Sequence, residues 1–211
     1  MKKLFFFAFI LGLTTAFGYS YWKTNKVAVV NKPENKKPIF SIETAPKNSV
    51  KGKIESLSGT VKWESRTATA PSEIVKPVTI QQGEVVETGE DGNTTIIFPE
   101  IASIALSSQS IISITQTLPT NFVFDQKEGS ISYEKISETP ISIRCLHLLT
   151  TLDSGKLTLT LDKDTLEITI NVKNGSATVA FNDLENVSTV INLKEGEKFI
   201  FNDDTRETST E

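Results

Sequence analysis

The sequence has little of the chemistry on which enzymes and metalloproteins depend. Among its 211 residues there is one cysteine and one histidine. A structural zinc site usually takes four Cys or His ligands, and a lone cysteine cannot close an intrachain disulfide. Phosphate-binding glycine loops, His-Glu-x-x-His and Gly-x-Ser-x-Gly motifs are also absent. We therefore predict that the protein is not an enzyme and has no catalytic residue, no metal site and no cofactor.

Positive charge is scarce outside the first quarter of the chain. Residues 1–53 contain ten lysines and two acids and carry +8, whereas the other 158 residues carry −12, for a total of −4. Binding to nucleic acid needs clustered Lys and Arg to face the phosphates. An acidic body of this length therefore predicts no nucleic-acid partner.

The N-terminus contains a long uncharged run that is mostly apolar. Residues 4–22 carry no charge over 19 positions, which is enough for a helix to cross a hydrocarbon core of about 30 Å. One interpretation is a cleaved signal peptide cut before Tyr19. The other is a retained anchor at residues 1–22, with Tyr19, Tyr21 and Trp22 at the membrane interface. We favour the anchor because aromatic residues are expected at that interface.

The charges around this segment point in two directions. Lys2 and Lys3 precede it and five lysines follow it, which by the positive-inside rule favours a cytoplasmic body. A short basic segment followed at once by an apolar run is, however, the export signal itself. We therefore predict a single-pass protein of the cell membrane whose C-terminal domain is extracytoplasmic.

Residues 23–53 form a predicted linker. Pro33, Pro38 and Pro46 are spread among lysines and asparagines, a composition that favours an extended tether. The lysines could lie against anionic head groups or wall polymers, or could simply be solvated. The sequence leaves both interpretations open.

Apolar residues recur with period two from residue 54 onward. Leu157, Leu159 and Leu161 alternate with threonines, which is typical of strands with one buried face. We predict a single all-β domain at residues 54–202, a sandwich or a β-solenoid, followed by a polar tail at 203–211. Asp162 and Asp164 are expected to form a hairpin turn, and further turns are expected at Gly dipeptides that include Glu128-Gly129, Ser154-Gly155 and Asn174-Gly175.

Several glycine-containing pieces occur in a recognisable order. Gln82-Gly83-Glu84, Thr88-Gly89 and Asp91-Gly92 precede an apolar stretch at 94–98, and Ser58-Gly59-Thr60-Val61 and Leu193-Lys194-Glu195-Gly196-Glu197 lie near the two ends. Over residues 54–202 the chain resembles the FecR-type extracytoplasmic domain. The resemblance implies a β fold and an envelope location. The best-known members also carry a cytoplasmic anti-sigma segment before the membrane span, whereas here only Met1-Lys2-Lys3 precede the apolar run.

A few residues are candidates for specific chemistry. Cys145 and His147 share a face if they lie on one strand, as a metal pair or a nucleophile–base pair would require. We favour instead a packed thiol and a hydrogen-bonded histidine at a strand end. Trp63 is expected at a core or edge position, with a sugar-stacking platform as the alternative.

Acidic residues gather around the predicted turns of the 82–100 segment. Glu84, Glu87, Glu90, Asp91 and Glu100 together could form a Ca²⁺ site, but the calcium-loop spacing of acids is missing. We favour solvated acids on loops. The function that we predict is a membrane-tethered binding or scaffold module whose exposed sheet edge meets an envelope protein, or whose surface meets a wall polymer. The alternative is an envelope sensor that acts with a separate anti-sigma partner.

Overall fold

The computed structural model describes residues 44–211, and these form strands and turns without any helix. The strands are β1 (Gly52–Ser58), β2 (Val61–Glu64), β3 (Ser72–Glu73), β4 (Thr79–Ile80), β5 (Val85–Thr88), β6 (Asn93–Phe98), β7 (Ala102–Leu106), β8 (Ile111–Leu118), β9 (Asn121–Lys135), β10 (Ile141–Cys145), β11 (Leu148–Asp162), β12 (Glu167–Asn182), β13 (Ser188–Lys194), β14 (Lys198–Asn202) and β15 (Thr208–Thr210).

The all-β prediction is thus confirmed for the described residues. In this part of the chain there is no helix that could serve as a membrane span. The predicted span at residues 1–22 and most of the predicted linker lie outside the described residues.

The period-two alternation produces the expected two faces. In β11, Leu157, Leu159 and Leu161 are buried, while Thr158 and Thr160 lie on the outer face. The Thr158 and Thr160 hydroxyls are hydrogen bonded to Ser132 (2.8 Å) and Ser130 (2.9 Å) of β9. Polar side chains on the solvent-facing side therefore form hydrogen bonds between adjacent strands, and the apolar side chains fill the core.

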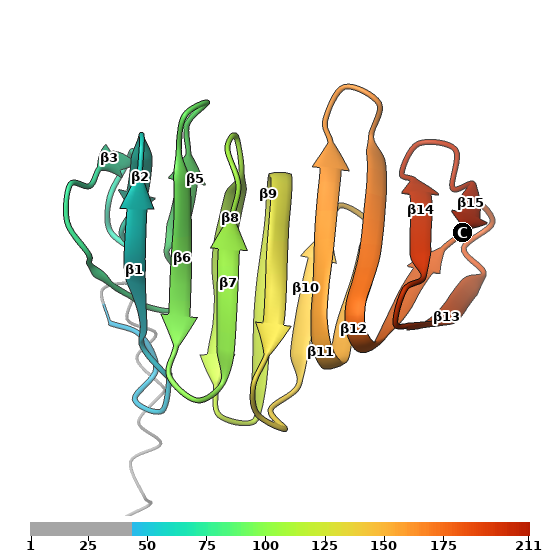
Figure 1. Ribbon diagram of the computed structural model, residues 1–211, viewed down its shortest axis with the longest axis horizontal. Helices are drawn as coiled ribbons and strands as arrows, with labels where there is room; N and C mark the ends of the chain where they lie inside the picture. The colour runs from blue at the N-terminus through green and yellow to red at the C-terminus, as the bar shows by residue number, and fades with distance from the viewer. Residues whose placement is uncertain (1–43) are drawn as a thin grey trace, which may run out of the picture. The chain divides into compact units, whose positions relative to one another are not determined.

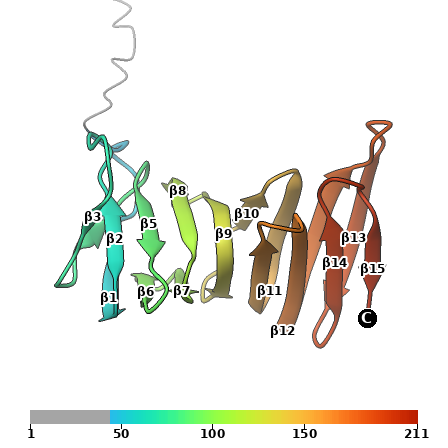
Figure 2. The ribbon, with the colours of Figure 1, turned by 90° about the horizontal axis from the view of Figure 1, so that it is seen from above.

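The strands lie in two layers that face each other across this core (Figures 1 and 2). The first layer has the order β4-β1-β6-β7-β9-β11-β12-β14-β15. The second has the order β3-β2-β5-β8-β9-β10-β11-β12-β13. Strands β9, β11 and β12 occur in both orders because each bends from one layer into the other.

Glycines make these bends possible. Gly129, Gly155 and Gly175 have φ values of 79°, 77° and 79°, a left-handed conformation that costs glycine little. Gly155 of β11 lies opposite Gly175 of β12, so the two neighbouring strands bend in register. The prediction that these dipeptides end their strands was wrong, because the ladder pairing continues on both sides of each bend.

The side on which the chain changes layer switches halfway along the body. Apart from the connections of the short strands β3 and β4, the changes up to β9 occur at the upper rim of Figure 1, at Gly59, 89–92, 107–110 and Gly129. After β9 they occur at the lower rim, at 136–140, Gly155, Gly175 and Gly196. The layers face each other as in a sandwich, but the chain advances along the long axis as in a solenoid.

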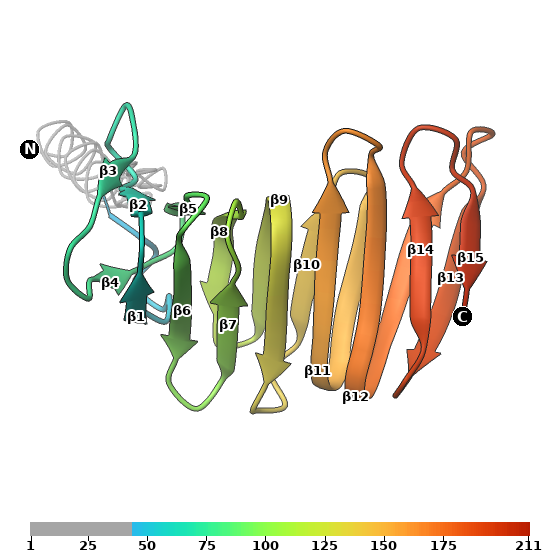
Figure 3. The same ribbon diagram turned by 45° about the horizontal axis from the view of Figure 1, so that its top comes forward.

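The two ends of the body differ in the strands that terminate each layer (Figure 3). One end has β3 and β4, of two residues each, and the other has β15, of three residues, and β13, of seven. Strand β15 pairs with β14 and lies within the segment that we predicted to be a polar tail. Strand β1 likewise begins two residues before the predicted start of the domain.

Candidate functional site

The structure separates the two residues of the predicted Cys145–His147 pair. Cys145 ends β10 with its side chain in the core, whereas His147 lies in the turn to β11 and its side chain is 68% exposed. Leu146 between them has a φ of 52°, so the chain turns and the two side chains do not share a face. Burial, aided by the charges of Asp125 and Asp203, raises the pKa of the Cys145 thiol to about 12. The thiol therefore stays protonated and cannot act as a nucleophile at neutral pH.

His147 is held by a buried carboxylate from a distant part of the chain. Asp203 accepts hydrogen bonds from the His147 backbone N–H (3.1 Å), from its ring Nδ1 (2.9 Å) and from Arg206 Nη1 (3.2 Å). The Asp203 backbone N–H donates to the Leu166 carbonyl. These bonds link the two layers at the upper rim, where the C-terminal half of the chain makes no crossing of its own.

A hollow of 460 Å³ lies beside this cluster. It is lined by His147 and Arg206, by Leu149 and Ala180, and by the turn between β12 and β13. Ser188 is also in the lining, but its hydroxyl donates to Asn182 Oδ1 (2.8 Å). The Ser188 hydroxyl therefore bonds Asn182 rather than His147.

The acids of the 82–100 segment do not converge. Glu87 pairs with Lys62 (3.2 Å), Asp91 accepts from the Thr60 backbone N–H (3.1 Å), and Glu100 lies in the turn at the opposite rim. That bond to Thr60 also lowers the pKa of the Asp91 carboxyl. Within residues 44–211 no three His, Cys, Asp or Glu side chains are placed to hold a metal ion together.

Glu84 instead accepts a hydrogen bond from Trp63, a contact that the sequence did not predict. Glu84 is 2% exposed, and its Oε2 accepts from Trp63 Nε1 (3.0 Å) and from the Gln81 backbone N–H (2.9 Å). Its Oε1 accepts from Gln81 Nε2 (3.3 Å). The carboxylate thus joins β2 to the turn before β5, and a hollow of 350 Å³ lies next to it.

A third buried acid, Asp125, lies on β9 between two cations. Its carboxylate is 2.8 Å from Arg144 Nη2 and 2.6 Å from Lys127 Nζ. Burial opposes ionisation of Asp125, but the hydrogen bonds and charges of Arg144 and Lys127 outweigh it, so the carboxyl pKa lies below its ordinary value. Asp162, by contrast, accepts from the Thr165 and Asp164 backbone N–H groups and forms the predicted hairpin turn, with Asp164 exposed in it.

Several apolar groups of the C-terminal half that are exposed or partly exposed cluster near β13. Leu149, Ala180 and Val190 lie side by side on β11, β12 and β13, and Leu149 and Val190 are 43% and 63% exposed. Leu184 and Val187 in the adjoining turn are also exposed. We call these five residues the β13 patch. Among the described strands β13 pairs only with β12, so its other edge is open.

Comparison with known proteins gives a fold but no family. No protein-family model matches the chain, and no curated protein matches it. Two crystal structures of a candidate anti-sigma factor from Parabacteroides distasonis ATCC 8503 are similar in structure, with TM-scores of 0.53 and 0.52 and identities of 13% and 14%. Each alignment covers 60% of this chain and 58% of the other. The β fold is therefore shared, while the resemblance to FecR-type domains stays a prediction.

Proposed function

We propose that the chain is a non-catalytic binding module of the cell envelope that takes up an extended segment of a partner protein along β13. In this proposal residues 1–22 anchor the chain in the membrane and the acidic β body stands outside the cytoplasm. The observation that carries the proposal is the open edge of β13 beside the β13 patch.

The β13 edge is unusual within this molecule. The other three terminal strands have two or three residues, too few to pair with another chain, whereas β13 has seven. A long open edge presents unpaired N–H and C=O groups that an added strand can satisfy. Proteins normally protect such an edge, so an unprotected one favours a binding role.

The surrounding side chains indicate what kind of segment would fit. A strand added beyond β13 would place every second side chain next to Val190, in line with Leu149 and Ala180. Asp183 and Glu185 carry negative charge in the turn between β12 and β13. The segment that fits best is extended, has apolar residues at alternate positions, and carries a basic residue toward that turn.

Photo-crosslinking in living cells tests this proposal. A photoreactive residue placed at Asn192, which is exposed on β13, should form a cross-link to an envelope protein. Val190→Lys should weaken the cross-link at least tenfold, because a charge on the exposed edge opposes pairing. Val75→Lys is the matched control, since Val75 is 88% exposed and lies at the other end of the body.

Three results would overturn the proposal. They are a cross-link that Val190→Lys leaves unchanged, a product that contains two copies of this chain, and a cytoplasmic partner.

A second candidate function is that of an envelope sensor in transmembrane signalling. It is favoured by the structural similarity to a candidate anti-sigma factor. The similarity extends over 58% of the neighbour. In this candidate function the β body senses a condition in the envelope and acts with a separate anti-sigma partner. An anti-sigma protein cross-linked at Asn192 would select this function over a general scaffold.

A further inference from the structure

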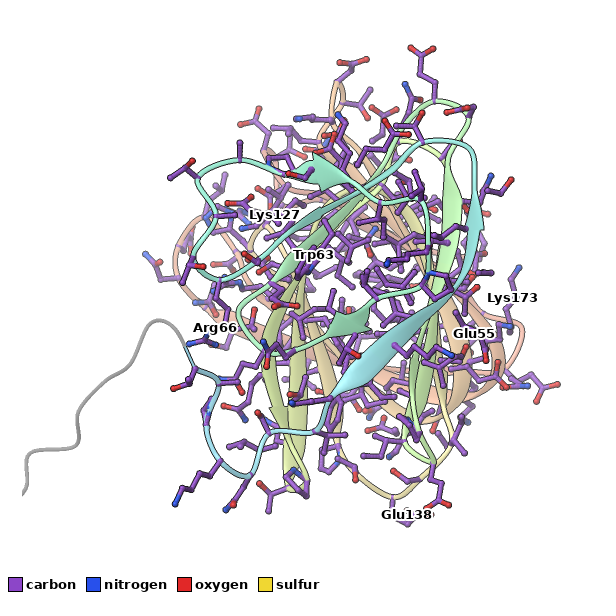
Figure 4. The ribbon with its side chains drawn as sticks, turned by 90° about the vertical axis from the view of Figure 1, so that its left-hand side faces the viewer. Glu55, Trp63, Arg66, Lys127, Glu138 and Lys173 are labelled. Atoms are coloured by element: carbon purple, nitrogen blue, oxygen red, sulfur yellow. The ribbon has the colours of Figure 1, made fainter. Side chains whose placement is uncertain are left out.

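We propose that the hollow beside Trp63 binds an acidic carbohydrate, such as a short chain of uronic acids. This hollow lies at the β1–β4 end, toward which Figure 4 looks and where it labels Trp63 and Arg66. Its volume of 350 Å³ is large enough for one or two sugar rings. The proposal is independent of strand addition at β13, which terminates the opposite end.

Trp63 provides a fixed aromatic surface. Its ring packs against the core but stays partly exposed and lines the hollow. The bond from Nε1 to the buried Glu84 carboxylate holds the indole in one orientation. A ring that is already ordered loses little conformational freedom when a ligand stacks on it, which favours binding.

The remaining lining is polar and favours a negative ligand. Lys51 and Arg66 contribute positive charge, and Gln81 and three hydroxyl side chains (Ser65, Thr67 and Thr79) can form hydrogen bonds. The one carboxylate, Glu84, already accepts three hydrogen bonds from Trp63 and Gln81. A sugar with hydroxyls and a carboxylate matches the aromatic surface, the hydrogen-bonding groups and the two cations at once.

A hydrogen bond to the backbone holds the Arg66 side chain in one position. Its Nη1 donates to the Gln82 carbonyl at 2.5 Å, which places the guanidinium beside the turn that leads into β5. A planar guanidinium can bind a carboxylate through two parallel hydrogen bonds, which a compact ammonium cannot do. Arg66 therefore contributes an oriented positive charge beside the hollow, and Lys51 contributes a second one.

Tryptophan fluorescence of the full-length chain tests the proposal. The chain has two tryptophans, so Trp22→Phe leaves Trp63 as the only one. Titration with tetragalacturonate should change the Trp63 emission in a saturable way, while the neutral maltotetraose should bind at least tenfold more weakly. Lys51→Ala should weaken binding of tetragalacturonate about threefold or more at low salt.

Lys173→Ala is the matched control, because Lys173 is also an exposed lysine but does not line the hollow. It should leave the affinity unchanged. Absence of a saturable change, equal affinity for both sugars, or an equal loss in the two lysine variants would each overturn the proposal.

Discussion

Asp125 illustrates how a buried charge is stabilised in this protein at the scale of one residue. Its side chain is 8% exposed, whereas those of Arg144 and Lys127 are 58% and 54% exposed. The two cations thus keep most of their hydration while they neutralise the acid. Only Asp125 is buried, so the cost of removing the cations from water is largely avoided. The arrangement stabilises the folded state only while Asp125 is ionised.

We therefore expect Asp125→Asn to lower the free energy of unfolding by about 1–2 kcal/mol at pH 7. Because the pKa of Asp125 is lower in the folded than in the unfolded state, its contribution is fully present above the unfolded value of about 3.9. The contribution is lost as the pH falls through the folded value. The free energies of unfolding of the two proteins, measured with urea, should thus converge as the pH falls through that folded value.

Asp204→Asn serves as the control, since it removes the same charge from an exposed position. Its effect on the free energy of unfolding should stay within about 0.5 kcal/mol. A difference between wild type and Asp125→Asn that persisted unchanged at pH 2 would contradict the electrostatic explanation.

At the scale of strands, the bends at Gly155 and Gly175 carry β11 and β12 from one layer into the other. A methyl group at Gly155 would overlap the Asn174 backbone carbonyl, and one at Gly175 would overlap that of Ser154. Gly196 also has a positive φ, of 86°, but an added methyl there would meet no atom within 4 Å. Glycine is therefore needed at positions 155 and 175 both for its positive φ and for lack of space. At position 196 it is needed for its positive φ alone.

We predict that Gly155→Ala destabilises the fold by about 3 kcal/mol or more, because it adds a backbone clash to the left-handed strain. Gly196→Ala should cost only about 1 kcal/mol. Denaturant midpoints measured by circular dichroism give the comparison. Equal losses in the two variants would mean that the bend does not depend on close approach of the backbones.

These bends also mark the limit of what could be predicted from the sequence. The alternation of Leu and Thr was sufficient to predict strands and their buried faces, because it depends on neighbouring residues only. Asn174-Gly175 and Glu195-Gly196 look alike locally, yet the first bends a continuous strand and the second turns between β13 and β14. The difference arises because Gly175 lies opposite a second glycine, Gly155, which no local pattern reveals.

The candidate sites could not be predicted from the sequence for the same reason, because they depend on contacts between distant residues. Asp203 contacts His147 across 56 positions, and Glu84 contacts Trp63 across 21. Trp63 and Glu84 were each singled out from the sequence, but as parts of different hypotheses. Their pairing follows from the register of β2 with β5, which places Glu64 opposite Val85 and brings the turn before β5 to Trp63.

At the scale of the whole molecule, the shared strands make the two layers and the two halves interdependent. The first part of β9 pairs with β8 and β10 in one layer, and its second part pairs with β7 and β11 in the other. Neither half of the body can therefore detach without breaking β9. This connectivity predicts one cooperative unfolding transition for residues 44–211.

Two probes far apart in the fold can test this cooperativity. In the Trp22→Phe chain, Trp63 emission reports on the β1–β4 end, and labelling of Cys145 reports on the core near β10. Cys145 should react only after unfolding, because it is buried and its folded pKa is about 12. We expect the two urea midpoints to agree within about 0.2 M, and Gly155→Ala to lower both by the same amount. A Cys145 transition that preceded loss of the Trp63 signal would show instead that the C-terminal half opens alone, and that β9 does not transmit stability between the halves.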